Sequence, residues 1–165
     1  MSIRPFVPWP NQMVRSVADP VESVTDEIRA IWQDMIDTME AMPGLGLAAP
    51  QIGVMLRLAV VDCSQERGRA ICLANPELLD VSSTLRVHEE GSPNLPGVSA
   101  KLKRPDTVTV AFLGFDGTRV EQEFEGVWAT SVQHQTDHLN GRMYFDNLSR
   151  VKRQILLKKA GKAAR

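Results

Sequence analysis

Two histidines in this sequence have the spacing of a metal-binding pair. His134 and His138 lie in the segment TSVQHQTDHLNG (130–141). Residues four apart on a helix share one face, so both imidazoles can point at one ion, and imidazole is a common ligand of zinc and other transition metals. The pair alone is weak evidence, because surface and core histidines are frequent. Gln135 stands beside His134, and an amide cannot act as a general base near neutral pH.

Two further segments have the composition of functional loops. GLGLAAPQIG (44–53) is a glycine-rich turn followed by Gln51, and EEGSPNLPG (89–97) is predicted to be a loop because glycine and proline are closely spaced in it. Together with QHQTDH (133–138), these segments resemble the three signature motifs of the peptide deformylases in order and separation. Those motifs run roughly G-apolar-G-apolar-A-A-x-Q, E-G-C-L-S and Q-H-E-x-D-H. The resemblance covers essentially the whole chain, and the first motif is intact.

The resemblance implies an activity and a cofactor. Peptide deformylases remove the formyl group from the N-terminal methionine of new chains, and they hold a divalent metal with one cysteine and two histidines. The two histidines match His134 and His138. The resemblance also assigns Gln51 as the donor to the formyl oxygen.

The resemblance further implies a set of peptide contacts. Gly46 matches the glycine that hydrogen-bonds the bound peptide backbone, and Glu90 matches the acidic residue that opens the second motif. Val127, Thr130 and Ser131 match the pocket for the first side chain. Two of these three are polar where an apolar lining would suit methionine, which predicts a shifted ligand preference. Ordinary helix packing is the alternative interpretation of these three residues.

Three positions depart from the family pattern, each in a different part of the reaction. Ser92 stands at the cysteine position, and a neutral hydroxyl is a far weaker metal ligand than a thiolate. Gln135 stands at the position of the glutamate that transfers the proton, and loss of a general base costs about 10²–10⁴-fold in rate. Pro93 stands where a backbone N–H stabilises the oxyanion. Proline has no N–H, and one lost donor costs about 10²–10³-fold in turnover.

These departures predict a deformylase-like protein without ordinary deformylase activity. The expectation for the cofactor is none, apart from weak zinc, iron or nickel binding at His134 and His138. The signals that form the fold are intact, which favours a retained binding role. We therefore expect the groove to bind peptide N-termini.

The alternative is a weak or altered metal-dependent deformylase. In that case Ser92 ligates the metal as an alkoxide, or Glu89, Glu90 or His88 supplies the missing ligand. Ser92 could also act as a nucleophile activated by His134, although the sequence shows no third group that would orient this histidine.

The C-terminal segment RVKRQILLKKAGKAAR (150–165) carries seven of the 19 Lys and Arg residues and no acidic residue. It resembles the basic C-terminal helix through which some deformylases dock on the ribosome, so salt-sensitive binding to the ribosome or RNA is expected. It contains no aromatic residues for base stacking. The alternative is a solvated, basic helix end without a partner.

The elements that must position these residues favour an α+β fold, with mixed or antiparallel sheets around a central helix that carries the histidines. Helical spacing of apolar residues over 23–44 predicts an amphipathic helix, which Ser23 or Thr25 caps. A second helix is predicted to start near Val127, and a basic C-terminal helix is predicted over about 148–160. Strands are predicted over 56–63, 70–79 and 107–126, the last being a hairpin that turns near Asp116-Gly117.

Length and composition limit the remaining possibilities. A chain of 165 residues fits one domain, here predicted to span 1–165, with a sizeable core. No apolar run is long enough to cross a bilayer, and the N-terminus lacks the apolar region of a secretory signal, so no membrane partner is expected. Cys63 and Cys72 are expected to be free thiols on strands, which favours a cytoplasmic location.

Overall fold

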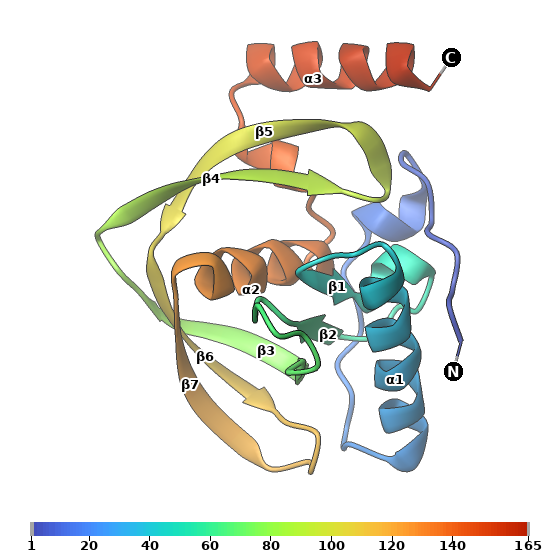
Figure 1. The fold of residues 1–165 in the computed structure, drawn as a ribbon, viewed down its shortest axis with the longest axis vertical. Coiled ribbons are helices and arrows are strands. Elements are labelled where there is room, and N and C mark those ends of the chain that lie inside the picture. The colour runs from blue at the N-terminus through green and yellow to red at the C-terminus, as the bar shows by residue number, and fades with distance from the viewer. Residues whose placement is uncertain (1, 165) are drawn as a thin grey trace.

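The computed structural model describes residues 2–164 and has an α+β architecture (Figure 1). The three long helices are α1 (Asp26–Ala41), α2 (Gly126–Leu139) and α3 (Arg150–Ala163). The strands are β1 (Gly46–Ala48), β2 (Leu58–Val61), β3 (Ile71–Val81), β4 (Leu85–Ser92), β5 (Leu95–Pro105), β6 (Thr107–Leu113) and β7 (Arg119–Glu125). Short 3-10 helices are η1 (Gln12–Arg15), η2 (Ala49–Ile52) and η3 (Tyr144–Asn147).

The sheets lie on either side of helix α2. Five antiparallel strands pair in the order β1-β2-β3-β6-β7, and β4 and β5 form a separate antiparallel pair. Helix α2 runs between the two sheets, with α1 beside the larger sheet and α3 outside β5 (Figure 1). The predicted fold class, with the histidine helix at its centre, is confirmed.

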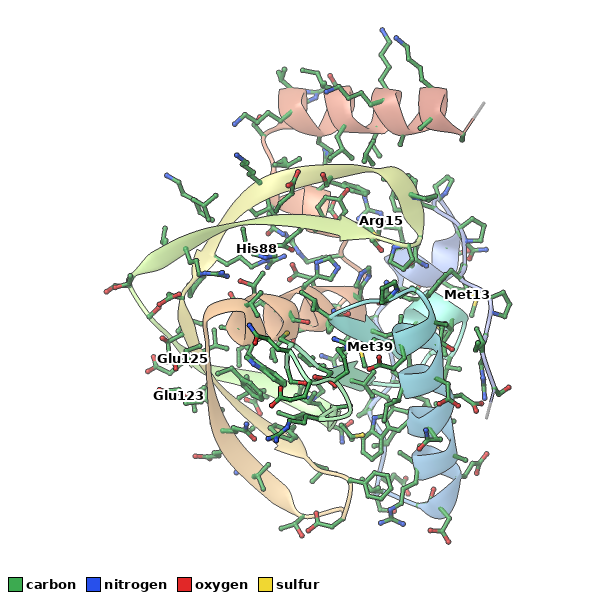
Figure 2. All side chains as sticks on the ribbon, in the orientation of Figure 1. Met13, Arg15, Met39, His88, Glu123 and Glu125 are labelled. Atoms are coloured by element: carbon green, nitrogen blue, oxygen red, sulfur yellow. The ribbon has the colours of Figure 1, made fainter. Side chains whose placement is uncertain are left out.

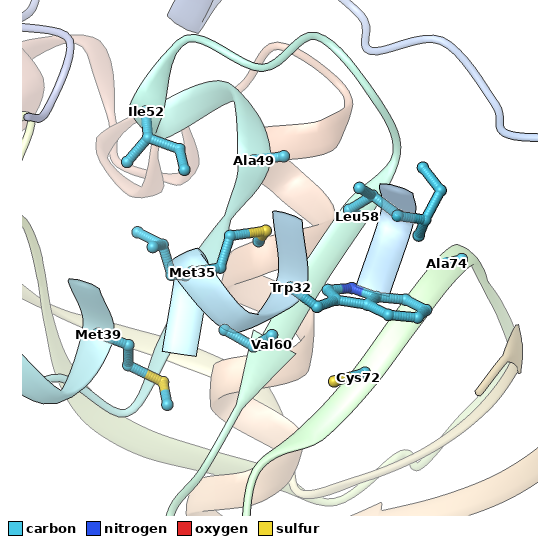
Figure 3. Packing of buried hydrophobic residues seen from close by; sticks show 11 residues of the cluster. Trp32, Met35, Met39, Ala49, Ile52, Leu58, Val60, Cys72 and Ala74 are labelled. Carbon is cyan, nitrogen blue, oxygen red and sulfur yellow. The ribbon is translucent and has the colours of Figure 1, made fainter. Parts of the chain in front are cut away.

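Helix α1 anchors one core against the larger sheet. Its N-cap is Thr25, whose hydroxyl oxygen accepts a hydrogen bond from the Ile28 N–H, one of the two caps that the sequence predicted. Trp32, Met35 and Met39 are fully buried against β1 and β2 (Figure 3). Burial of each such side chain stabilises the fold by about 1.5–3 kcal/mol. This core fixes the position of the segment that leads into β1.

The predicted hairpin over 107–126 is confirmed as β6 and β7. Its turn includes Asp116, whose carboxylate accepts a hydrogen bond from the Thr118 N–H, and Gly117, which has a φ of 87°. Phe124 and the inward residues of β6 pack beneath α2. Glu123 and Glu125 of β7 point outward on the opposite side of that strand (Figure 2).

The prediction of a loop over 89–97 is wrong. The structure places the end of β4 and the start of β5 there, joined by a turn at Pro93-Asn94. The strand was missed because its polarity is inverted: Leu85 and Val87 face solvent, while His88 faces inward. Because the apolar residues of this strand are on its exposed face, the alternation in the sequence does not indicate which face is buried. The glycine-rich turn of the first motif likewise contains β1.

Helix α3 spans 150–163, close to the predicted 148–160, and packs on β5 through Leu156 and Ala160. Both cysteines are free. Cys72 lies in β3 as predicted, whereas Cys63 lies just beyond the end of β2. Within residues 2–164, no helix combines the length and apolar character needed to cross a bilayer.

Candidate functional site

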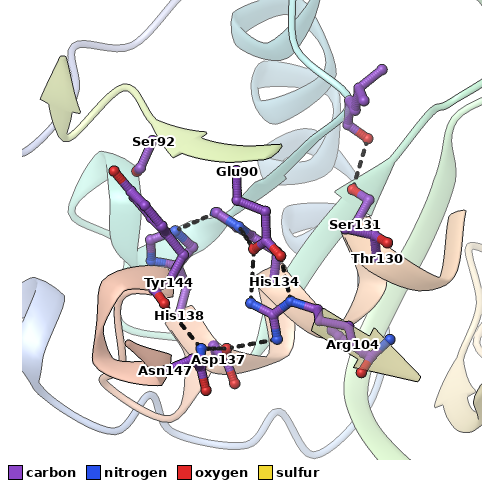
Figure 4. Close-up of polar contacts among 12 residues, drawn as sticks. Glu90, Ser92, Arg104, Thr130, Ser131, His134, Asp137, His138, Tyr144 and Asn147 are labelled. Atoms are coloured by element: carbon purple, nitrogen blue, oxygen red, sulfur yellow. Dashed lines mark hydrogen bonds and ion pairs between the residues drawn. The ribbon is translucent and has the colours of Figure 1, made fainter. Parts of the chain in front are cut away.

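A cavity of about 370 Å³ lies between β4, helix α2 and the segment that leads into β1. The structure brings nearly all of the predicted site residues to this cavity. Its lining includes Gly46, Gln51, Glu90, Ser92, Pro93, Val127, Thr130, Ser131, His134 and Gln135. His138 lies behind His134 and is fully buried (Figure 4).

The two histidines are arranged as the sequence predicted. The Nε2 atoms of His134 and His138 are 3.2 Å apart, and Nδ1 of His134 lies 2.8 Å from Oε1 of Glu90. Because Glu90 accepts at Nδ1, that nitrogen carries the proton and Nε2 of His134 keeps its lone pair. Burial is the main cause that lowers the pKa of His138 well below its usual value. Both imidazoles are therefore suited to act as neutral ligands.

A buried ionic network orients His134 from behind. Glu90 accepts two hydrogen bonds from Arg104, at 2.6 and 2.8 Å, and Arg104 also pairs with Asp137 at 3.1 Å. Asp137 in turn accepts from Asn147, so the network reaches η3 (Figure 4). Burial alone would raise the pKa of Glu90, but hydrogen bonds from Arg104 and His134 outweigh it and the pKa is lowered.

The geometry corrects the role predicted for Glu90. The sequence grouped this residue with the peptide contacts, yet both of its carboxylate oxygens are engaged inside the protein. Glu90 therefore holds His134 in place. Sequence reasoning gave no role to Arg104 or Asp137, although both are charged residues inside the segments that resemble the family. Asp137, which stands next to His138 in the sequence, was an available signal, whereas Arg104 reaches the site only through the fold.

Ser92 belongs to a closed hydrogen-bond cluster with Gln51 and Asn94. Nε2 of Gln51 donates to Asn94 at 2.8 Å and to Ser92 at 3.3 Å, and Ser92 donates to Asn94 at 3.1 Å. Oε1 of Gln51 accepts from the Ala48 N–H at 2.9 Å. The amide donors of Gln51 are thus already in use, and a ligand oxygen has to compete with Asn94 for them.

In contrast to Gln51, Gln135 has a side-chain atom without a hydrogen-bond partner. Its side chain is buried, and Oε1 has no hydrogen-bond partner. Its amide nitrogen lies so close to β1 that a Cβ placed on Gly46 would be 2.5 Å from it. Pro93, at the end of the same cavity, brings no backbone N–H. The amide of Gln135 can accept or donate a hydrogen bond, but it cannot take up a proton.

The residues of the predicted side-chain pocket lie together on the first turns of α2. Ser131 donates to the Leu45 carbonyl at 3.0 Å, and Thr130 donates to the Gly126 carbonyl at 3.4 Å. Val127 completes this part of the lining. The hydroxyl hydrogens are engaged, but each hydroxyl oxygen still adds polarity to the cavity.

A helix that presents two neutral imidazoles to one point, oriented by a buried carboxylate, is the arrangement of a metal-dependent hydrolase site. Residues 3–154 match the family model of the polypeptide deformylases. A peptide deformylase of Methylocella silvestris is 44% identical over all of this chain and 87% of its own length. The chain belongs to the peptide deformylase family.

Solved structures agree with this assignment. A peptide deformylase from Legionella pneumophila has a TM-score of 0.92 at 37% identity, with 99% of this chain and 96% of that chain covered. A class I type b peptide deformylase from Acinetobacter baumannii, crystallised with Met-Ala-Ser bound, has a TM-score of 0.83 at 30% identity, with 90% and 100% covered.

Family membership overturns the expectation that the protein holds no cofactor. That prediction is wrong, because peptide deformylases are metal-dependent and the curated relatives carry that name. The histidines fit such an ion: Nε2 atoms 3.2 Å apart suit two ligands whose bonds to zinc are about 2.0–2.1 Å. Ser92 lines the same cavity and offers a neutral oxygen. Within the described chain, no third His, Cys, Asp or Glu joins the pair to form a metal-binding group.

Proposed function

We propose that this protein binds a divalent metal at His134 and His138 and peptide N-termini in the adjoining cavity, and that its deformylase activity is lost or strongly reduced. The observation that carries the proposal is Gln135, an amide beside the histidine pair where the proton-transferring carboxylate is expected. The related enzyme that was crystallised with Met-Ala-Ser supports a peptide in this cavity.

The chemistry follows from what each group can do. A bound divalent ion supplies a Lewis acid and lowers the pKa of water. Hydrolysis of a formamide also needs a group that moves a proton to the leaving amine. Gln135 cannot do so, and the carboxylates in the lining are engaged, Glu90 with Arg104 and His134 and Glu89 with the Ser99 hydroxyl. The cavity is therefore better suited to binding than to turnover.

Formate release from formyl-Met-Ala-Ser, measured on zinc-, nickel- and iron-loaded protein, tests the proposal. The unmodified chain should be slow with all three metals. Gln135→Glu should raise the rate by about 10²–10⁴-fold because it restores the proton acceptor. Pro93→Leu should add up to about 10²–10³-fold by restoring an N–H, and Ser92→Cys should tighten metal binding.

Gln122→Glu is the matched control, since this glutamine is exposed on β7 and is not part of the cavity lining. It should leave the rate unchanged. Rapid formate release by the unmodified chain would disprove the loss of activity. No gain in the triple variant of Ser92, Pro93 and Gln135 would show that the cavity itself no longer accepts a formyl peptide.

We also propose that helix α3 docks the protein on ribosomal RNA, in the cytoplasm. Its basic residues are mostly exposed, and within the described chain Arg153 is the one that has an acidic partner, Asp146. Co-sedimentation with ribosomes should weaken steeply with salt and in a Lys152→Glu, Lys159→Glu variant. Co-sedimentation that is unaffected by either change would contradict this docking role.

A further inference from the structure

Two side chains that line the cavity each carry a buried polar atom without a hydrogen-bond partner. Within the described residues, three buried side-chain atoms have no hydrogen bond: Nε1 of Trp32, Nδ1 of His88 and Oε1 of Gln135. Trp32 belongs to the α1 core, but the other two residues line the cavity. Native proteins pair the great majority of their buried polar atoms. Two such side chains on one cavity are therefore available to pair with a ligand.

These two side chains approach the cavity from opposite walls. His88 points from β4 toward α2 (Figure 2), whereas Gln135 belongs to α2 and rests against Gly46. The last torsion of a glutamine side chain is broad and roughly two-fold, so the amide can turn either its oxygen or its nitrogen to a ligand. A neutral imidazole likewise has one donor and one acceptor. Both walls can thus take part in two-way hydrogen bonding.

Thr130 and Ser131 add acceptors between these walls. Each hydroxyl donates its hydrogen to a backbone carbonyl, so its oxygen keeps a lone pair for a donor on a ligand. Nη1 of Arg86 already donates to the Thr130 hydroxyl oxygen at 3.4 Å, which leaves that oxygen one further lone pair, and the charge of Arg86 disfavours a cationic ligand. Glu89 and Glu90 line the cavity and disfavour an acidic one. The lining therefore suits a neutral group that both donates and accepts.

We propose that the cavity selects peptides whose first residue has a carboxamide side chain, glutamine above all, over the thioether of methionine. This inference rests on the proposed function, because it concerns the first side chain of a peptide bound in that cavity. A carboxamide donates through its NH₂ group to Gln135 or the hydroxyl oxygens and accepts through its oxygen from His88. A thioether is a weak acceptor and no donor, so it leaves both walls unpaired. Glutamine is also close to methionine in length.

Calorimetric titration of the nickel-loaded full chain with formylated X-Ala-Ser peptides tests the preference. X is glutamine, methionine, norleucine or lysine. Glutamine should bind roughly tenfold more tightly than norleucine, which corresponds to one or two net hydrogen bonds. Methionine should resemble norleucine, and lysine should bind more weakly than glutamine. This comparison uses the unmodified protein and does not depend on any variant.

Variants then locate the preference. His88→Leu and Thr130→Val remove polar groups of the lining and should each reduce the advantage of glutamine by severalfold. Thr136→Val is the matched control, because this hydroxyl lies on the same helix, donates to the Val132 carbonyl and is not part of the cavity lining. It should leave the preference unchanged.

The outcomes separate this inference from the proposed function. Methionine or norleucine binding as tightly as glutamine would overturn the carboxamide preference while peptide binding stands. An advantage of glutamine that persists in both His88→Leu and Thr130→Val would also overturn it, because these walls would not be its source. Failure of all four peptides to bind would remove the preference and the peptide-binding function together.

Discussion

Two neighbouring residues of helix α2 stand in opposite surroundings. His134 is held by a chain of partners through Glu90, Arg104 and Asp137, and the polar atoms of that chain are paired. Gln135, the next residue, has a buried oxygen without any partner. The difference shows that the half of the site that positions the two histidines is held by paired polar groups. The half of the site around Gln135 and His88 instead has polar atoms that no group of the described chain pairs.

The largest loss of stability is expected when the buried ion pair of Glu90 and Arg104 is broken. Glu90→Gln removes the buried charge opposite Arg104, and the loss of one partner of a buried ion pair costs about 3–5 kcal/mol. Urea unfolding of metal-free protein measures the loss. Glu89→Gln is the control, since Glu89 is exposed, and it should stay within about 0.5 kcal/mol. A cost of Glu90→Gln no larger than its control would mean that the network does not support the site.

Stabilisation by a bound metal should test the part of the site that contains His134 and His138. Because the ion binds the folded state, zinc or nickel at about a hundred times its Kd should stabilise the protein by about 2.7 kcal/mol. Thermal unfolding with and without metal measures the shift, which His138→Ala should abolish. His88→Gln is the control and should keep the shift. Loss of the shift in that control would instead make His88 a ligand, as one alternative from the sequence allowed.

Two glutamines of α2 provide a direct comparison of paired and unpaired amides. Gln133 and Gln135 are 6% and 5% exposed, but Gln133 donates to the carbonyls of Pro105 and Ala129, each at 3.0 Å. Gln133→Leu should destabilise the protein by about 1–3 kcal/mol. Gln135→Leu should be neutral or stabilising by about 1 kcal/mol, because it removes an unpaired group. Equal losses in chemical denaturation would show that Gln135 has a partner in solution.

The smallest effect is expected at Asp146, which precedes Asn147, the residue of η3 where the network behind His134 ends. Burial alone would raise its pKa, but hydrogen bonds from Arg15 and the Met143 N–H outweigh it, so the pKa is lowered. A lowered pKa contributes stability above the unfolded value of about 3.9, and that stability is lost as the pH falls through the folded value. Asp146→Asn should cost about 1 kcal/mol near neutral pH.

Unfolding free energies measured across the acid range check this sign. The cost of Asp146→Asn should shrink toward zero as the pH falls through the folded pKa, because the parent carboxyl is then protonated too. A cost that stays constant with pH would exclude the charge as its cause.

The sequence predicted those features of the fold and the site that depend on neighbouring residues, and it did not predict those that depend on tertiary contacts. Thr25 and the apolar stripe of α1 predicted the first helix, and Asp116-Gly117 predicted the hairpin turn. Strand β4 was missed because it hides His88 and Glu90 rather than Leu85, so its buried face has no apolar signature. The partners of Gln51 and Glu90 also escaped prediction, since Asn94 and Arg104 reach them only through the tertiary fold. The unpaired oxygen of Gln135 is a property of its surroundings and of no motif.

The close approach of Gln135 to Gly46 has a consequence for how this site could change over generations. The glycine leaves room for a flat head group of one size, which glutamine and glutamate share. Exchange between them replaces one nitrogen by one oxygen and asks for no repacking of β1 or α2. A single exchange at this position therefore changes the chemistry of the site while the packing between β1 and α2 stays the same.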